Sequence, residues 1–362
     1  MSVAQTKTRS DRRRSNMELA ESGSLKMGRM KIGVIGAGAV GSACLLSSIL
    51  RGTAREIVVV NRDRKRAKAV VTDLQYGAAL SSVVQICDGD YSDLTGAGLV
   101  MITVGLNEKA GGATNRDDPA GRLKLLESNV GIYREILPEI YRTVPEAVIL
   151  VVTDPPDPLA DLVRTFGFTR VLSTGTFLDS LRFRFHVARQ LNVVPASVEA
   201  DVLGEHGTSE VFMWSSAQVA GVPVLEALRQ AGRGLEELRR TVEQEVRYAN
   251  ITIIEGNQAS QFGIGMVSAR IAEIVLRDER GVIPIGSYHP KYGVTLSMPS
   301  VLGQTGVVQI LEPAMSAEER QALQLSAETL KAAVARIVAA NLSKGARTTF
   351  DIARRRPATG HR

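Results

Sequence analysis

The sequence predicts an α/β protein, in which a doubly wound parallel sheet is followed by a second domain of α+β type. Three observations lead to this prediction. The 362 residues are 44% apolar and 23% charged, the balance of a globular chain long enough for two domains. Short β-rich runs alternate with helical stretches from Lys31 onward. After Thr174 this alternation gives way to a different pattern.

The first half of the chain contains apolar runs that we interpret as buried parallel strands. In sequence order they are KIGVIG, EIVVV, VVQIC, LVMITVG and AVILVV. Helical stretches lie between them: one begins at Ala39, one reaches Tyr76 and one passes through Leu137. This order is typical of a parallel sheet, because a crossover between parallel strands usually carries a helix.

The second half predicts a mixed set of elements. We expect a helix over 178–191, a strand-rich middle, two long helices within 235–277, paired strands over 281–298 and an amphipathic helix over 316–340. No internal repeat or low-complexity linker separates the halves. We therefore expect them to pack closely, with a cleft between them.

The net charge of +6 lies mostly at the two ends of the chain. Residues 1–30 carry seven Lys and Arg against three Asp and Glu, and residues 343–362 carry six against one. The residues between them therefore carry a net charge of −3. A folded body without excess positive charge argues against nucleic acid as a partner.

The N-terminal segment and the cysteines favour a cytoplasmic location. Residues 1–29 lack an apolar run long enough for a signal peptide or a membrane span, and we expect them to be disordered. Because Met17, Met27 and Met30 precede the first strand, this extension could also reflect the choice of start codon. Cys44 and Cys87 have no metal or redox spacing, so we expect buried thiols and no metal.

A glycine-rich turn directly follows the first predicted strand. Gly36, Gly38 and Gly41 form a G-x-G-x-x-G motif that opens a helix, with Ala39 and Val40 between the last two glycines. Glycines at this spacing allow a tight turn and let main-chain N–H groups approach a pyrophosphate. The motif predicts a Rossmann dinucleotide-binding domain. We place that domain at 30–174, a catalytic domain at 175–343 and a basic tail at 344–362.

The end of the second strand indicates which dinucleotide is bound. An Asp or Glu usually accepts hydrogen bonds from the adenine ribose there, but this chain has Asn61, followed by Arg62, Arg64, Lys65 and Arg66. A lost carboxylate and added guanidinium groups favour a 2′-phosphate. We therefore predict NADP, contacted by Asn61, Arg62 and Arg66, with NAD as the alternative if the arginines only form a solvated helix start.

Two further motifs resemble the reaction centre of the lactate/malate dehydrogenase family. They are Leu178-Asp-Ser-Leu-Arg182 and Gly204-Glu-His-Gly207, which match that family's L-D-x-x-R helix and G-E-H-G loop. The resemblance runs from about Lys31 to about Val338 and includes Arg122-Leu-Lys-Leu-Leu-Glu-Ser-Asn129. It implies a 2-oxo acid reductase that works by hydride transfer.

The resemblance also implies roles for the motif residues. His206 would donate a proton to the substrate carbonyl oxygen, and Asp179 would fix its tautomer. Arg182 follows Asp179 by three residues on one helix face and would hold the substrate carboxylate.

A loop arginine of the family would polarise the carbonyl. We assign this role to Arg122, because its distance to Asn129 fits the family, and Arg116 remains an alternative since the loop is about eight residues longer than usual. Val104, Gly105 and Asn129 match cofactor-binding positions.

Three positions depart from the family pattern. Glu108 lies where the family reads the substrate side chain, and Asp154 replaces an asparagine that touches both substrate and cofactor. Ser260 falls at the side-chain pocket. Two added acids predict a 2-oxo acid with a cationic or donor-rich side chain, unless Glu108 faces solvent beside Lys109 or Arg116.

Other functions remain open at this point. They are an ordinary lactate or malate dehydrogenase, a cyclic imine reductase on the same fold, and a cofactor-binding protein without catalysis. The resemblance also implies a homodimer or homotetramer.

Overall fold

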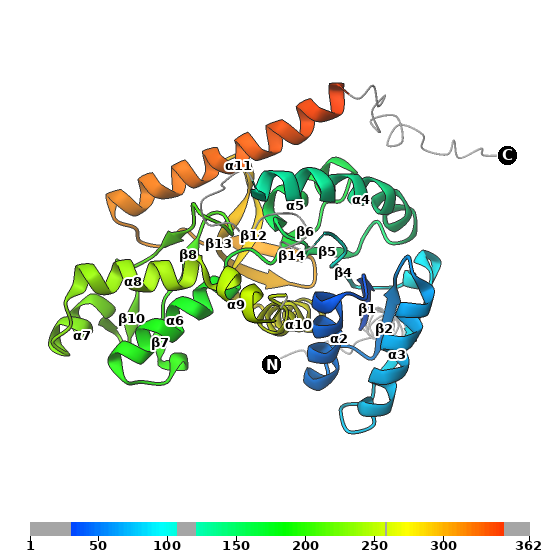
Figure 1. Cartoon of the computed structure of the whole chain (residues 1–362), viewed down its shortest axis with the longest axis horizontal. Helices are drawn as coiled ribbons and strands as arrows, with labels where there is room; N and C mark the ends of the chain where they lie inside the picture. The colour runs from blue at the N-terminus through cyan, green and yellow to red at the C-terminus, as the bar shows by residue number, and fades with distance from the viewer. Residues whose placement is uncertain (1–29, 107–120, 258, 344–362) are drawn as a thin grey trace, which may run out of the picture.

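The computed structural model describes residues 30–106, 121–257 and 259–343 (Figure 1). The predicted N-terminal extension and basic tail, and the loop residues Glu108 and Arg116, lie outside these ranges. Arg122 is the second residue of a helix, but its side chain is likewise outside the description.

The first half forms the predicted parallel sheet. Its strands run β3-β2-β1-β4-β5-β6 across the sheet, the doubly wound order of a Rossmann domain. Their bounds are β1 Lys31–Ile35, β2 Glu56–Val60, β3 Gln85–Asp88, β4 Leu99–Ile102, β5 Val148–Val151 and β6 Val171–Ser173. Strand β6 was not predicted, and it has only three residues.

Helices cover both faces of this sheet, since alternate strand residues point to opposite sides. In β4, Leu99 and Met101 pack on one face and Val100 and Ile102 on the other. The first face carries α2 (Ala39–Arg51), α3 (Arg64–Ala78) and α10 (Phe262–Arg277). The second carries α4 (Gly121–Thr143), α5 (Pro156–Thr165) and the short helix η1 (Tyr91–Leu94).

Three antiparallel strands extend the same sheet beyond β6. They are β12 (Val282–His289), β13 (Val294–Gly303) and β14 (Gly306–Ile310), and Gly286 of β12 pairs with Ser173 of β6. A side chain at Gly286 would collide with Ser173 and Asp157, which explains the glycine. The paired strands were predicted, whereas β14 and their continuity with the parallel sheet were not.

Together with α10 and β12 to β14, the remaining elements form the C-terminal domain. Here α6 (Phe177–Leu191), α7 (Val224–Gln230), α8 (Leu235–Arg247) and α9 (Ala249–Asn257) accompany short strands, and α11 (Ala317–Ser343) crosses one end of the molecule (Figure 1). The short strands are β7 Val198–Glu199, β8 Val202–Leu203, β9 Val211–Phe212, β10 Gln218–Val219 and β11 Val222–Pro223, and the turn η2 is Pro195–Ser197. The region predicted as two long helices contains three, α8, α9 and α10.

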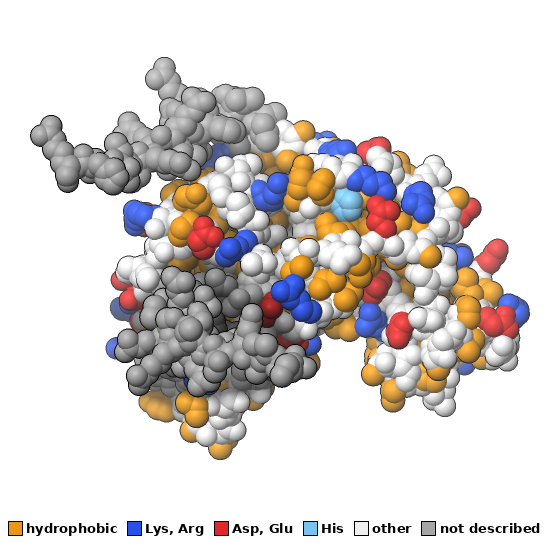
Figure 2. Space-filling view, turned by 180° about the vertical axis from the view of Figure 1, so that it is seen from behind, with side chains coloured by type: hydrophobic (Ala, Val, Ile, Leu, Met, Phe, Trp, Pro, Cys, Tyr) orange, Lys and Arg blue, Asp and Glu red, His pale blue; other side chains and the backbone are white. Residues whose placement is uncertain are grey.

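Charged and apolar side chains are mixed on one face of the molecule, and much of the apolar helix α10 is buried. On the face drawn in Figure 2, basic and acidic side chains are interspersed with apolar ones. Within the described ranges no single helix is long and apolar enough to cross a membrane, although the bent pair α9 and α10 meets the length and composition criteria together. Much of α10 is buried against α2 and the sheet, as in the core helix of a globular domain.

Cys44 is buried, as predicted, whereas Cys87 is only partly buried.

Candidate active site

A cavity of about 700 Å³ lies at the carboxyl ends of the parallel strands. Its wall includes Ile35 at the end of β1, Val60 at the end of β2, and the segments that follow β4, β5 and β6. In a doubly wound sheet this edge is where ligands bind, because the chain leaves β1 and β4 in opposite directions. The cavity brings together most of the residues predicted from the sequence.

The glycine turn forms one end of the cavity. Gly36 has a φ of +113°, which residues with a side chain rarely adopt, and a Cβ on Gly41 would lie 2.1 Å from the Gly36 oxygen. A Cβ on Gly38, in contrast, would meet nothing within 4 Å. Gly38 also begins α2 without a side-chain cap, so the first N–H groups of that helix are available to a ligand. This turn fits a dinucleotide pyrophosphate.

The polar residues after β2 hold this turn in place. Asn61 Oδ1 accepts a hydrogen bond from Ala37 N at 3.1 Å, and Asn61 Nδ2 donates to Asp63 O at 2.9 Å. Arg66 Nε donates to Ala37 O at 2.7 Å. The Asp63 carboxylate caps α3 by accepting from the main-chain N–H of Lys65 and Arg66.

The basic residues near Asn61 separate into two groups. Arg62 and Arg66 are exposed and line the cavity. Arg64 points elsewhere, with Nη1 2.7 Å from Asp90 and Nη2 3.3 Å from Asp88. Two carboxylates near the end of β3 therefore hold Arg64, which does not line the cavity.

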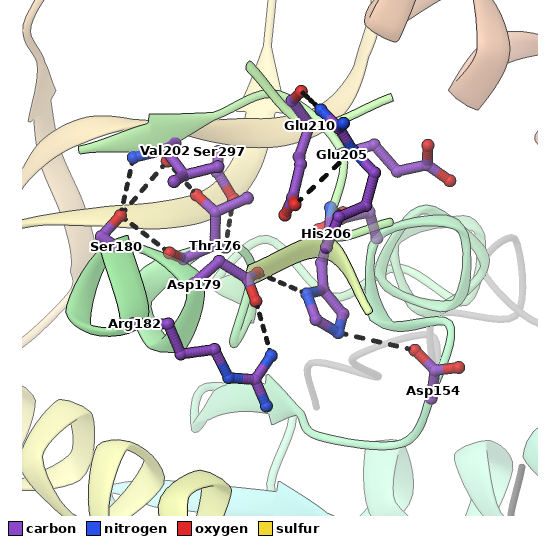
Figure 3. A network of polar contacts seen from close by, with 12 residues as sticks. Asp154, Thr176, Asp179, Ser180, Arg182, Val202, Glu205, His206, Glu210 and Ser297 are labelled. Carbon is purple, nitrogen blue, oxygen red and sulfur yellow. Dashed lines mark hydrogen bonds and ion pairs between the residues drawn. The ribbon is translucent and has the colours of Figure 1, made fainter. Parts of the chain in front are cut away.

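The opposite end of the cavity contains the predicted proton donor (Figure 3). His206 Nδ1 lies 2.6 Å from Asp179 Oδ2, and Arg182 Nη1 donates to Asp179 Oδ1 at 2.9 Å. Asp179 and Arg182 are one helical turn apart on α6, which places both beside the His206 loop. The Asp179 side chain is 2% exposed and lies behind His206 rather than in the cavity wall.

Asp154 approaches His206 from the other side. Its Oδ1 lies 3.9 Å from His206 Nε2, too far for a hydrogen bond but close enough for a strong charge interaction. Buried Asn129 fixes this segment from behind, since its Nδ2 donates to Asp154 O at 2.8 Å and its Oδ1 accepts from Leu106 N at 2.8 Å. Asn129 therefore supports the cavity wall without lining it.

The other predicted residues differ in their placement. Val104, Gly105 and Ser260 line the cavity, together with Asn250 and Ile254 of α9, which the sequence analysis missed. Gly41 lies beneath the turn rather than in the wall. Arg182 lines the cavity, as expected for a residue that could contact a carboxylate.

Two buried acids support the His206 loop and were not predicted. Asp157 Oδ2 accepts from His206 N at 2.8 Å, and its Oδ1 accepts from Ser173 Oγ at 2.5 Å. Burial raises the pKa of Asp157 to about 6, although both hydrogen bonds lower it. The pKa of Glu210 is also raised, first by burial and then by the nearby Asp179 carboxylate.

Comparisons with known proteins agree with this arrangement. The NAD binding domain of lactate/malate dehydrogenases matches residues 30–170, and their alpha/beta C-terminal domain matches residues 176–341. L-lactate dehydrogenase of Deinococcus radiodurans is 41% identical over 285 residues, which cover 78% of this chain and 91% of that protein. L-lactate dehydrogenase of Thermus aquaticus is 42% identical over 294 residues, with coverage of 79% and 92%.

Solved structures give the same result. A lactate dehydrogenase from a Medee basin deep-sea metagenome library aligns with a TM-score of 0.79 and 29% identity, covering 86% of this chain and 99% of its own. The minor L-lactate dehydrogenase of Enterococcus mundtii aligns with a TM-score of 0.79 and 30% identity, covering 85% and 98%. The predicted Rossmann domain followed by a second domain is thereby confirmed, with the second domain matching the family's alpha/beta C-terminal domain, and the chain belongs to the lactate/malate dehydrogenase family.

Proposed function

We propose that this dehydrogenase interconverts pyruvate and L-lactate with a nicotinamide dinucleotide. The observation that carries the proposal is the contact of Asp179 with both His206 and Arg182, because His206 and Arg182 line the same cavity as the glycine turn. The relatives named L-lactate dehydrogenase favour this reaction over the cationic substrate expected from the sequence. The bound dinucleotide would supply or accept the hydride.

Each side chain has a distinct task in this proposal. His206 Nε2 faces the cavity and donates a proton to the carbonyl oxygen of pyruvate, while Asp179 holds Nδ1 and stabilises the imidazolium. Arg182 is oriented by Asp179 and binds the substrate carboxylate with the remaining N–H groups of its guanidinium. Arg122 polarises the carbonyl in the family arrangement, and Arg116 remains its competitor.

The activity is tested by following a panel of 2-oxo acids at 340 nm with NADH and with NADPH. The panel contains pyruvate, oxaloacetate, a branched 2-oxo acid and 2-oxo-5-guanidinovalerate. We expect pyruvate to have the highest kcat/KM. A preference for oxaloacetate would overturn the proposal in favour of malate chemistry, and inactivity on the whole panel would favour a cofactor-binding protein without catalysis.

One observation favours a second candidate substrate class. The Asp154 carboxylate lines the cavity near His206, where it would attract a cationic substrate group and repel an anionic one. Glu108, the other acid behind this prediction, lies outside the described residues. A higher kcat/KM for 2-oxo-5-guanidinovalerate than for pyruvate would select this second candidate.

The cofactor proposal is that the site uses NAD(H) and also accepts NADP(H). NAD use is supported by the match to an NAD binding domain. Acceptance of NADP(H) is supported by neutral Asn61 at the end of β2 and by exposed Arg62 and Arg66 in the cavity wall. We expect N61D to raise the KM for NADPH at least about tenfold while leaving the KM for NADH within about twofold. An unchanged NADPH KM would contradict this role of Asn61.

We also propose that the enzyme is a homo-oligomer in the cytoplasm. The packed helices α2 and α10 expose large apolar side chains, with Leu50 67%, Phe262 62% and Met266 64% exposed. Large exposed apolar side chains on packed helices are a feature of association sites. Light scattering after size exclusion should give a dimer or tetramer, and a monomer at micromolar concentration would contradict the proposal.

A further inference from the structure

His206 lies between two carboxylates, one at each ring nitrogen (Figure 3). Asp179 comes from α6 and Asp154 from the segment after β5, so the two acids reach the ring from opposite sides. Asp179 holds Nδ1 by a short hydrogen bond, whereas Asp154 is 3.9 Å from Nε2. The proposed function requires Nε2 to carry the transferred proton, so Asp154 faces the reacting atom itself.

The charges around the His206 ring show how Asp154 affects protonation of that ring. Asp154 and Asp179 carry two negative charges, and Arg182 carries one positive charge. Protonation of His206 therefore makes this group of four neutral. The Asp154, Asp179 and His206 side chains are only 19%, 2% and 23% exposed, so water screens these charges less than it would at an open surface.

The other charged groups near His206 come from three neighbouring elements. Buried Asp157 at the start of α5 binds the His206 main-chain N–H, and Glu205 lies in the same loop. Glu210 precedes β9, and Arg247 at the end of α8 lies 3.9 Å from it. Burial raises the pKa of both Asp157 and Glu210. Among the acids named near His206, Asp154 is the only one that lines the cavity in the described part of the chain, since Asp157, Glu205 and Glu210 do not.

We infer that Asp154 is a positioning residue for catalysis: it stabilises the His206 imidazolium at Nε2 and so keeps the enzyme ready to reduce a 2-oxo acid at higher pH. The inference rests on the proposed role of His206 as proton donor. An opposite charge within about 4–6 Å favours the charged form of a titrating group. Asparagine at the same position would keep the shape of the cavity wall and remove this stabilisation.

The first measurement is a titration of the His206 ring by NMR in the protein without substrate, with H206N to assign its signal. We expect D154N to lower the pH of half-protonation of His206, so that its proton binding weakens about tenfold. The matched control is D201N, which removes a partly exposed carboxylate that pairs with Arg184, away from the cavity. A shift in D154N no larger than that in D201N would overturn the inference.

The second measurement is the pH profile of kcat/KM for pyruvate reduction between about pH 5 and about pH 10. We expect the alkaline limb of the D154N profile to move to lower pH by the same amount as the NMR midpoint. A purely structural role would lower the whole profile without moving this limb. Thermal unfolding shows whether D154N is folded. If it is not, D154S provides a second neutral side chain at this position, and its folding is checked in the same way.

The two measurements separate this inference from the proposed function. If the wild-type protein does not reduce pyruvate, the proposed function fails, but the NMR shift still tests the contact between Asp154 and His206. If pyruvate is reduced and neither the midpoint nor the limb moves in D154N, the inference alone fails.

Discussion

The two ends of the cavity differ in which parts of the chain form them. At the glycine turn the wall comes from one short segment, in which Gly36, Gly38, Ala39 and Val40 line the cavity. At the acidic end the wall depends on side chains from three separate segments, which carry Asp154, Asp179 and His206. The first end depends on glycines that lack a side chain, and the second depends on the positions of charged side chains. Added atoms should therefore damage the first end, and altered charges or protons should damage the second.

The largest expected effect is the loss of the proton donor in H206N. Asparagine occupies similar space but cannot exchange a proton near neutral pH, so kcat/KM for pyruvate should fall about 10³-fold. Steady-state kinetics at 340 nm measures this. H186N serves as the control, because His186 lies partly buried on α6 outside the cavity, and it should retain wild-type activity. Retention of most of the pyruvate rate by H206N would instead contradict the role of His206 as proton donor.

The next effect concerns the arginine proposed to polarise the substrate carbonyl. We expect R122A to lower kcat about 10²-fold, because it removes a group that stabilises developing charge on the carbonyl oxygen. R116A should keep kcat within about threefold. Both variants are compared by saturation kinetics with pyruvate. The reverse order of the two losses would move the assignment to Arg116.

A smaller effect should distinguish two glycines at the other end. Gly38 has a φ of −78° and open space around its Cα, so G38A should fold normally but weaken dinucleotide binding about tenfold, or about 1.4 kcal/mol. In G41A the new Cβ would lie 2.1 Å from the Gly36 oxygen, so this variant should lose thermal stability first. Calorimetric titration with NADH and thermal unfolding separate the two. Unchanged affinity in G38A would show that no ligand approaches this face.

The contrast between the two ends also explains what the sequence could predict. The glycine turn is local: its spacing after an apolar strand was enough to predict the nucleotide fold, and the structure has that turn at β1 and α2. The pairing of Asp179 with His206 joins residues 27 positions apart, and only the family resemblance linked them before the structure did. Asp157 was missed because it looks like one more acid after two prolines, although it binds the His206 main chain. The direction of Arg64 could not be predicted from its local sequence, since its partners Asp88 and Asp90 follow another strand.

The last effect is on stability rather than on activity or binding, and it tests the charge buried beneath the acidic end, at Asp157. Its pKa in the folded protein is about 6, above the ordinary value of 3.8, so folding favours the protonated form. The stability contributed by this proton is complete below about pH 4 and is lost as the pH rises through about 6. D157N cannot titrate. The free energy of unfolding of the wild type minus that of D157N should therefore fall by up to about 3 kcal/mol between about pH 4 and about pH 7 and then level off. Urea unfolding at several pH values measures this difference, and a difference independent of pH would mean that the Asp157 carboxylate is ionised at no cost beneath the His206 loop.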